Sequence, residues 1–107
     1  MAQFRCPYLS GKVDLTPERE QHITEHHPDL LPQHFGLVVD TLADPDQVRR
    51  SRRSSNARLF TRWFPALRGG KYVIVVVIAE PPPRRSWVIT AYMAGRLAGG
   101  DIEWQRS

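Results

Sequence analysis

The stretch Tyr72–Ile78, with the sequence YVIVVVI, is apolar at every position. A short, continuous apolar run rich in β-branched residues predicts a central strand that is covered on both faces. Similar short runs lie on either side of it, separated by turn-forming residues. Together they predict four strands, at about Gln47–Arg53, Arg58–Phe64, Lys71–Ala79 and Ser86–Met93. Because the connections are too short to hold crossover helices, these strands should form an antiparallel meander.

A first helix is expected before the sheet. Thr16 can cap its N-terminus, and Pro17 suits its first helical position. Pro28 disfavours helical geometry at the residue before it, so the helix should run from about Pro17 to His26 or His27.

A second helix should begin after Pro32, where apolar residues recur at helical spacing. This stripe comprises Phe35, Val38, Val39 and Leu42, and Asp44-Pro45-Asp46 ends it. The pattern predicts an α+β fold, in which two N-terminal helices pack on one face of a four-stranded antiparallel meander sheet. With 107 residues, the chain should form a single domain, 1–107, with residues 1–12 and 101–107 as flexible ends.

Alternation along the strands predicts what each sheet face offers. In the last strand it places Trp87, Ile89, Ala91 and Met93 on one face and Val88, Thr90 and Tyr92 on the other. In the second strand it places Arg58, Phe60, Arg62 and Phe64 opposite Leu59, Thr61 and Trp63. A face on which arginines alternate with aromatic residues could bind a phosphate backbone and stack bases. Alternatively, the arginine stems simply cover apolar surface.

The single cysteine, Cys6, excludes an intramolecular disulfide and a C-x-x-C pair, which fits a reducing cytoplasm. No G-x-S-x-G elbow is present, and we interpret Cys6 as a packed or idle thiol. The N-terminal segment lacks a signal-peptide core, and the longest apolar run, Val73–Ala79, is too short for a membrane span. We therefore expect a cytoplasmic protein with no membrane partner.

Charge is divided unevenly along the chain. Residues 1–47 contain three basic and eight acidic residues, whereas residues 48–107 contain twelve basic and three acidic ones. Thirteen of the fifteen basic residues are arginine, whose planar guanidinium pairs with phosphate in a bidentate manner and stacks on bases. This pattern favours an anionic partner such as nucleic acid; the alternative is a basic surface that merely improves solubility.

The stretch QHITEHHPDL, residues 21–30, contains an H-x-x-E-H pattern at His22, Glu25 and His26. Zinc needs further ligands, and no histidine or cysteine follows His34 to supply one. We therefore expect neither a metal site nor a cofactor.

Histidine and arginine together suit metal-free RNA cleavage. That reaction needs a base for the 2′-hydroxyl proton, an acid for the leaving 5′-oxygen and cationic donors for the phosphorane. His22 and His27 are five residues apart, which turns them about 140° apart on a regular helix. Either the helix unwinds before Pro28 and the two share a site, or they play separate roles. The alternative for each histidine is a solvated helix end.

An ordered set of segments resembles a known group of proteins. The segments are DLTPERxxHIxxxHP from Asp14, TLADPDQVRRS from Thr41, ARLFTRWF from Ala57, KYVIVVVI from Lys71 and WVITAY from Trp87. Together they look like the phage-associated branch of the barnase, EndoU, colicin-tRNase and RelE superfamily of nucleases. The resemblance spans about Val13 to Gly100 and implies a RelE- or barnase-like fold.

The resemblance implies a metal-independent endoribonuclease of phage or toxin type that acts on RNA, such as tRNA or mRNA, with an antitoxin or immunity protein as a further partner. The implied site comprises His22 and His27 as acid and base, Arg58 and Arg62 as phosphate stabilisers, and Thr90 as a positioning group. Nucleic-acid binding is assigned to Arg49, Arg50, Arg52, Arg53, Lys71, Tyr92 and Arg96. His26 lies between two matched positions and is not assigned a catalytic role.

Two alternatives to an enzyme remain open. One is a non-catalytic module of the same fold that binds nucleic acid or an acidic partner through its arginines. The other is a subunit of a toxin and antitoxin pair, which would use Trp63, Phe64 and Trp87 as a contact patch.

Overall fold

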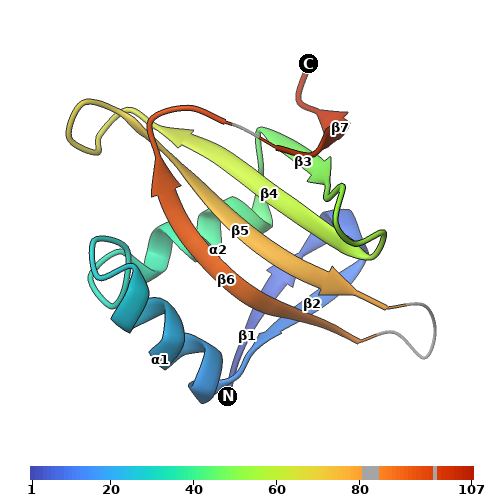
Figure 1. Ribbon diagram of the computed structural model, residues 1–107, viewed down its shortest axis with the longest axis horizontal. Helices are drawn as coiled ribbons and strands as arrows, with labels where there is room; N and C mark the ends of the chain where they lie inside the picture. The colour runs from blue at the N-terminus through green and yellow to red at the C-terminus, as the bar shows by residue number, and fades with distance from the viewer. Residues whose placement is uncertain (81–84, 98) are drawn as a thin grey trace.

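A computed structural model describes residues 1–80, 85–97 and 99–107. Its body is a seven-stranded mixed sheet with the order β1-β2-β6-β5-β4-β3-β7 (Figure 1). The strands are β1 (Ala2–Cys6), β2 (Gly11–Leu15), β3 (Gln47–Arg50), β4 (Ala57–Phe64), β5 (Lys71–Ala79), β6 (Ser86–Ala94) and β7 (Asp101–Gln105). The helices are α1 (Pro17–His26) and α2 (Phe35–Ala43), with a single 3-10 turn, η1 (Pro7–Leu9), between β1 and β2.

The predicted fold class is wrong, because the sheet has seven strands and is not a four-stranded antiparallel meander. The helices and the four strands β3 to β6 lie within a few residues of their predicted positions, and these four strands do pair in antiparallel order. Strands β1, β2 and β7 were not predicted, and the parallel pairing of β2 with β6, at Asp14 and Trp87, makes the sheet mixed.

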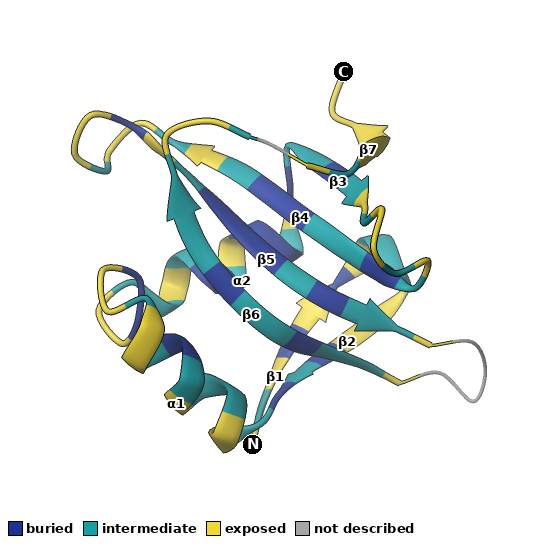
Figure 2. Cartoon of the chain, viewed as in Figure 1, coloured by how far each residue is buried: buried dark blue, intermediate teal, exposed yellow. Residues whose placement is uncertain are grey.

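The missed strands carry weak sequence patterns. In β1 and β2 only Phe4, Cys6, Val13 and Leu15 are buried, so each strand shows just two inward positions. Every residue of β7 is exposed, as Figure 2 shows, and the alternation of Ile102 and Trp104 with polar residues spans only five positions, which is too short a signal to identify a strand. Both segments that were expected as flexible ends therefore contain strands, and β7 pairs with β3 along the far edge of the sheet.

The central strand β5 is covered fully on one face only. Val73, Val75 and Val77 are completely buried against the core to which α2 contributes Val38 and Leu42. We call this side of the sheet the helix face; Figure 1 shows α2 behind the strands. On the opposite side, Val76 and Ile78 are only partly buried, although Ile74 is buried. The prediction that β5 is covered on both faces is therefore only half right.

We call the opposite side the open face. The pairing register places on it Gln47 and Arg49 of β3, Leu59, Thr61 and Trp63 of β4, Tyr72, Ile74, Val76 and Ile78 of β5, and Trp87, Thr90 and Tyr92 of β6. Most of these residues are partly exposed, so the open face is available to a ligand.

A β-bulge in β6 changes which side chains share a face. Val76 pairs with Thr90 and Val77 pairs with Val88, so Ile89 is an extra residue in the strand. Val88 consequently faces the core together with Ala91, whereas simple alternation placed them on opposite faces. The predicted face assignment is therefore wrong for Trp87 and Val88, because one inserted residue reverses the parity before it, and it holds from Thr90 onward.

Helix α1 lies beside β6, beyond the point where β2 stops pairing with that strand. Thr16 caps it by accepting a hydrogen bond from the backbone N–H of Arg19 at 3.2 Å. The guanidinium of Arg19 donates to the carbonyl oxygen of Ile89 at 3.3 Å, and Ile23 is buried in the core. These contacts fix the helix and carry its C-terminal end to the margin of the open face.

Candidate functional site

Two adjoining hollows occupy the middle of the open face. The first, of about 130 Å³, is lined by Arg49, Leu59, Thr61, Ile74, Tyr92, Ala94, Arg96 and Leu97. The second, of about 430 Å³, is lined by Ser51, Arg52, Arg53, Leu59, Val76, Tyr92, Gly99 and Gly100. Because Leu59 and Tyr92 line both, the hollows form one depression, which we call the arginine groove. Four of the six arginines and lysines that were predicted to bind nucleic acid line it, and so does Tyr92.

His27 lies at the margin of this groove. Its ring centroid is 5.8 Å from that of Tyr92, with the planes tilted by 37°. The position follows from the end of α1: His27 leaves helical geometry, with φ −133° and ψ 64°, while its N–H still donates to the carbonyl oxygen of Ile23 at 2.7 Å. The helix therefore unwinds before Pro28, and the ring of His27 lies against Tyr92 of the sheet and not beside His22.

His22 has a different environment. Its ring stacks on that of His26, with a centroid distance of 4.2 Å and an interplanar angle of 29°. Nδ1 of His26 lies 2.9 Å from the carbonyl oxygen of His22. Glu25 accepts a hydrogen bond from the amide of Gln21 at 3.0 Å. Within residues 1–80, 85–97 and 99–107, no group of three or more His, Cys, Asp or Glu side chains is placed to hold a metal ion.

Arg58 and Arg62, the predicted phosphate stabilisers, point to the helix face. The register pairs them with Val77 and Val73, two core residues of β5. Arg62 interacts with the end of α2, where it lies 3.6 Å from a carboxylate oxygen of Asp44. The sheet thus separates both arginines from Thr90 and Tyr92, which the hypothesis grouped with them. Alternation shows which residues of one strand share a face, but only the pairing register shows which residues of two strands lie on the same face of the sheet.

Glu103 of β7 gathers three partners on the helix face. Arg58 donates to it at 2.9 Å, Arg50 lies 3.1 Å away, and the hydroxyl of Tyr8 donates at 2.5 Å. Although burial opposes it, the hydrogen bonds from Tyr8 and the two arginines lower the pKa of Glu103. Arg50 and Arg58 therefore attach β7 to the sheet. Sequence reasoning missed Glu103 because it assigned no structure to the last residues.

Burial, followed by the hydrogen bond to Glu103, raises the pKa of Tyr8 to about 12 from its ordinary value of 10.0. The folded state thus favours the protonated phenol, and this stabilisation is present below pH 10.0 and is lost as the pH rises through about 12. We expect Tyr8→Phe to remove it, lowering the free energy of unfolding at neutral pH by about 1.5–3 kcal/mol. Urea denaturation between pH 7 and 12 measures this.

The matched control is Tyr72→Phe, because no hydrogen bond of the Tyr72 hydroxyl occurs within the part of the chain that the structure describes. Between pH 10.0 and about 12 the wild type and Tyr72→Phe should lose more stability than Tyr8→Phe does. Parallel pH profiles for all three proteins would contradict the assigned role of Tyr8.

The arginines of the groove differ in how far they are already paired. Arg52 forms an ion pair with Asp101 at 2.8 Å, which lowers the pKa of that carboxyl group. Arg49 donates instead to neutral groups, at 3.0 Å to the carbonyl oxygen of Gly99 and at 3.1 Å to the side chain of Gln47. These bonds orient its guanidinium without neutralising it. Among described residues no carboxylate forms an ion pair with Arg49, Arg53 or Arg96, so the groove retains positive charge.

Three further predictions concern residues outside the groove. Lys71 is exposed at the start of β5, where it pairs with Phe64 on the helix face. Phe64 therefore does not share a patch with Trp63 and Trp87, which lie near opposite ends of the open face. The proposed contact patch of these three aromatic residues is therefore not formed.

Cys6 is fully buried, and burial raises the pKa of its thiol.

Neither helix in the described part of the chain has the length and apolar character needed to cross a membrane. Comparisons with family models, with curated proteins and with solved structures found no match to this chain. The case for function accordingly depends on the geometry of the open face.

Proposed function

We propose that the protein binds single-stranded RNA in the arginine groove and cleaves it without a metal ion. The observation that carries this proposal is the placement of His27 against Tyr92, at the margin of a groove that contains Arg49, Arg53 and Arg96. A proton-transfer group, an aromatic hydroxyl and unneutralised guanidinium groups thus meet at one place. The nuclease superfamily that the sequence resembles would account for the same chemistry.

The proposed reaction is a transesterification. His27 accepts the proton of the 2′-hydroxyl, and the 2′-oxygen forms a bond to phosphorus. The bond from phosphorus to the 5′-oxygen breaks, and the hydroxyl of Tyr92 gives its proton to that leaving oxygen. The products are a 2′,3′-cyclic phosphate and a 5′-hydroxyl; proton exchange with water then restores both side chains. Arg49, held in position by Gly99 and Gln47, donates to the phosphorane oxygens.

This proposal keeps part of the site suggested by the sequence and changes the rest. His27 and Tyr92 have direct roles, and Thr90 positions substrate from the same face of β6. Arg49 replaces Arg58 and Arg62 as the phosphate stabiliser, because those two point to the helix face. An antitoxin or immunity protein would act most simply by covering the groove with acidic side chains.

The test is incubation of the purified protein with total RNA in the presence of EDTA, followed by analysis of the fragment ends. We expect cleavage that is unaffected by EDTA, with 2′,3′-cyclic phosphate and 5′-hydroxyl termini. Cleavage that EDTA abolishes, or fragments with 3′-hydroxyl ends, would contradict the metal-free mechanism.

One observation favours a second candidate, a non-catalytic RNA-binding module. His22 stacks on His26, so only one of the two predicted acid and base histidines contacts Tyr92. This candidate predicts RNA binding that weakens steeply with salt and no cleavage under any condition.

A further inference from the structure

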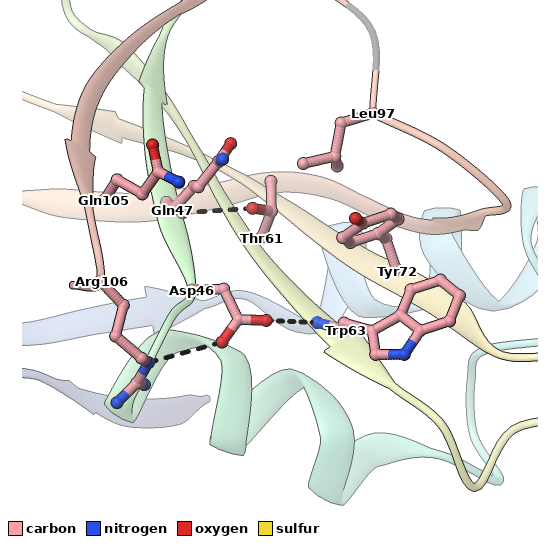
Figure 3. A pocket seen from close by; sticks show the side chains of 8 residues that line it. All are labelled: Asp46, Gln47, Thr61, Trp63, Tyr72, Leu97, Gln105 and Arg106. Carbon is pink, nitrogen blue, oxygen red and sulfur yellow. Dashed lines mark hydrogen bonds and ion pairs between the residues drawn. The ribbon is translucent and has the colours of Figure 1, made fainter.

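A third hollow, of about 230 Å³, extends the arginine groove toward the end of β4 (Figure 3). It shares Thr61 and Leu97 with the 130 Å³ hollow of the groove, so the two are continuous. Its remaining walls come from β3, β5, β7 and the segments next to them, including Gln47, Tyr72 and Gln105. A strand of RNA that lies in the groove would therefore reach this hollow.

The indole of Trp63 forms an exposed but fixed wall of the hollow. Trp63 is 38% exposed and lies near the end of β4. The ring meets that of Tyr72 edge-on, with a centroid distance of 4.8 Å and an interplanar angle of 64°. It also packs directly over the backbone of Gly70, where a Cβ atom would lie only 2.2 Å from Cζ2 of the indole. Contacts with the ring of Tyr72 and with the backbone of Gly70 thus hold the indole in place.

Two of the polar side chains that line the hollow, Gln47 and Gln105, are neutral amides. In the described part of the chain the side chain of Gln105 makes no hydrogen bond, and that of Gln47 uses only Oε1, which accepts from Arg49. Asp46 is already engaged, because it accepts from the backbone N–H of Trp63 at 2.7 Å and lies 3.5 Å from Arg106. The free donors and acceptors therefore include two amides and the hydroxyl of Tyr72 beside an aromatic surface, which suits a neutral, planar, heteroaromatic ligand.

We infer that this hollow is a subsite for an unpaired RNA base, which stacks on Trp63 while Gln47 and Gln105 hydrogen-bond to its edge. Trp63 and Tyr92 are two strands and two residues apart in the register, roughly 12 Å between Cα atoms. A base in the subsite and a phosphate beside Tyr92 can then belong to neighbouring nucleotides of one strand. The inference rests on the proposed function and adds recognition of a base to it.

The test compares binding of a short, fluorescently labelled single-stranded RNA to wild type, Trp63→Ala, Trp63→Phe and Trp104→Ala. Trp104 is the matched control because it is also 38% exposed but lies on β7, outside the hollow. We expect Trp63→Ala to weaken binding by roughly 5- to 150-fold, the range for loss of one stacked base. Trp63→Phe should retain most of the affinity, and Trp104→Ala should bind within about twofold of wild type.

A second RNA, in which all bases are replaced by abasic sites, separates stacking from phosphate binding. Wild type and Trp63→Ala should bind it equally. If Trp63→Ala folds poorly, quenching of Trp63 fluorescence by the RNA, measured in a Trp87→Phe and Trp104→Phe background, gives the same information. Equal affinities of Trp63→Ala and Trp104→Ala for the normal RNA, or absence of quenching, would overturn the subsite.

The two proposals fail in different ways. If wild type cleaves RNA and His27→Ala does not, while Trp63→Ala binds and cleaves like wild type, the subsite is wrong and the proposed function stands. If wild type neither binds nor cleaves RNA, both are wrong. If Trp63→Ala binds weakly and wild type never cleaves, the subsite stands on a binding module.

Discussion

His27→Ala is expected to slow RNA cleavage by about two to four orders of magnitude while leaving RNA affinity nearly unchanged. The imidazole is the proposed base, and a methyl side chain cannot accept the 2′-hydroxyl proton. Affinity should persist because the phosphates contact arginines, which the substitution does not touch. Cleavage rates under single-turnover conditions, together with binding measured by fluorescence anisotropy, distinguish these two effects.

His22→Ala is the matched control for this prediction. It removes an imidazole from the same helix, but one that stacks on His26 and not on Tyr92. Its cleavage rate should remain within a few-fold of wild type. A loss in His22→Ala as large as that in His27→Ala would restore both histidines to the site and contradict the single-histidine mechanism. A wild-type rate in His27→Ala would exclude His27 as the base.

Arg49→Ala is expected to have the second largest effect, a reduction in cleavage rate of about 100- to 1000-fold, because it removes an oriented cation from the charge that develops on the phosphorane. Binding should weaken as well, and the slope of log Kd against log salt should fall by about 0.7 for the loss of one contact to a single strand. Arg49→Lys should recover only part of the rate, since an ammonium group lacks the bidentate guanidinium geometry.

Arg58→Ala tests the face assignment. Arg58 belongs to the neighbouring strand β4, but it points to the helix face and pairs with Glu103. We expect this variant to cleave RNA at close to the wild-type rate and to lose about 1–3 kcal/mol of unfolding free energy, because a partly buried carboxylate loses a partner. If Arg58→Ala lost cleavage while Arg49→Ala retained it, the reacting phosphate would lie on the other side of the sheet.

Local patterns were sufficient for much of the chain. The uninterrupted apolar run of β5, the Thr16 cap and Pro28 each act through a few neighbouring residues, so their structural consequences could be predicted. Strands β1 and β2 form only because Phe4 and Val13 pair with one another and pack on a core from the rest of the chain. Strand β7, exposed throughout, is held by its pairing with β3 and by ion pairs across the fold.

The candidate site was predicted in composition but not in arrangement. The histidine, tyrosine and arginines that meet on the open face were all named from the sequence, yet Arg58 and Arg62 were assigned to the wrong group. Two facts decided this: the pairing of β4 with β5, which places Arg58 and Arg62 beside core residues, and the pairing of β5 with β6, which places Thr90 and Tyr92 on the other face. Neither is encoded within a single strand.

The sequence by itself determined that this chain has two helices, a central β-branched strand and an arginine-rich second half, because those properties depend on residue type and on near neighbours. Only the tertiary structure decided which arginines have a carboxylate partner and which keep a charge that no carboxylate compensates. Acids distant in sequence, Asp44, Asp101 and Glu103, neutralise Arg62, Arg52 and Arg58, whereas Arg49 is oriented by neutral groups beside Tyr92 and His27. Ion pairing acts through space, so its outcome depends on how the strands are brought together.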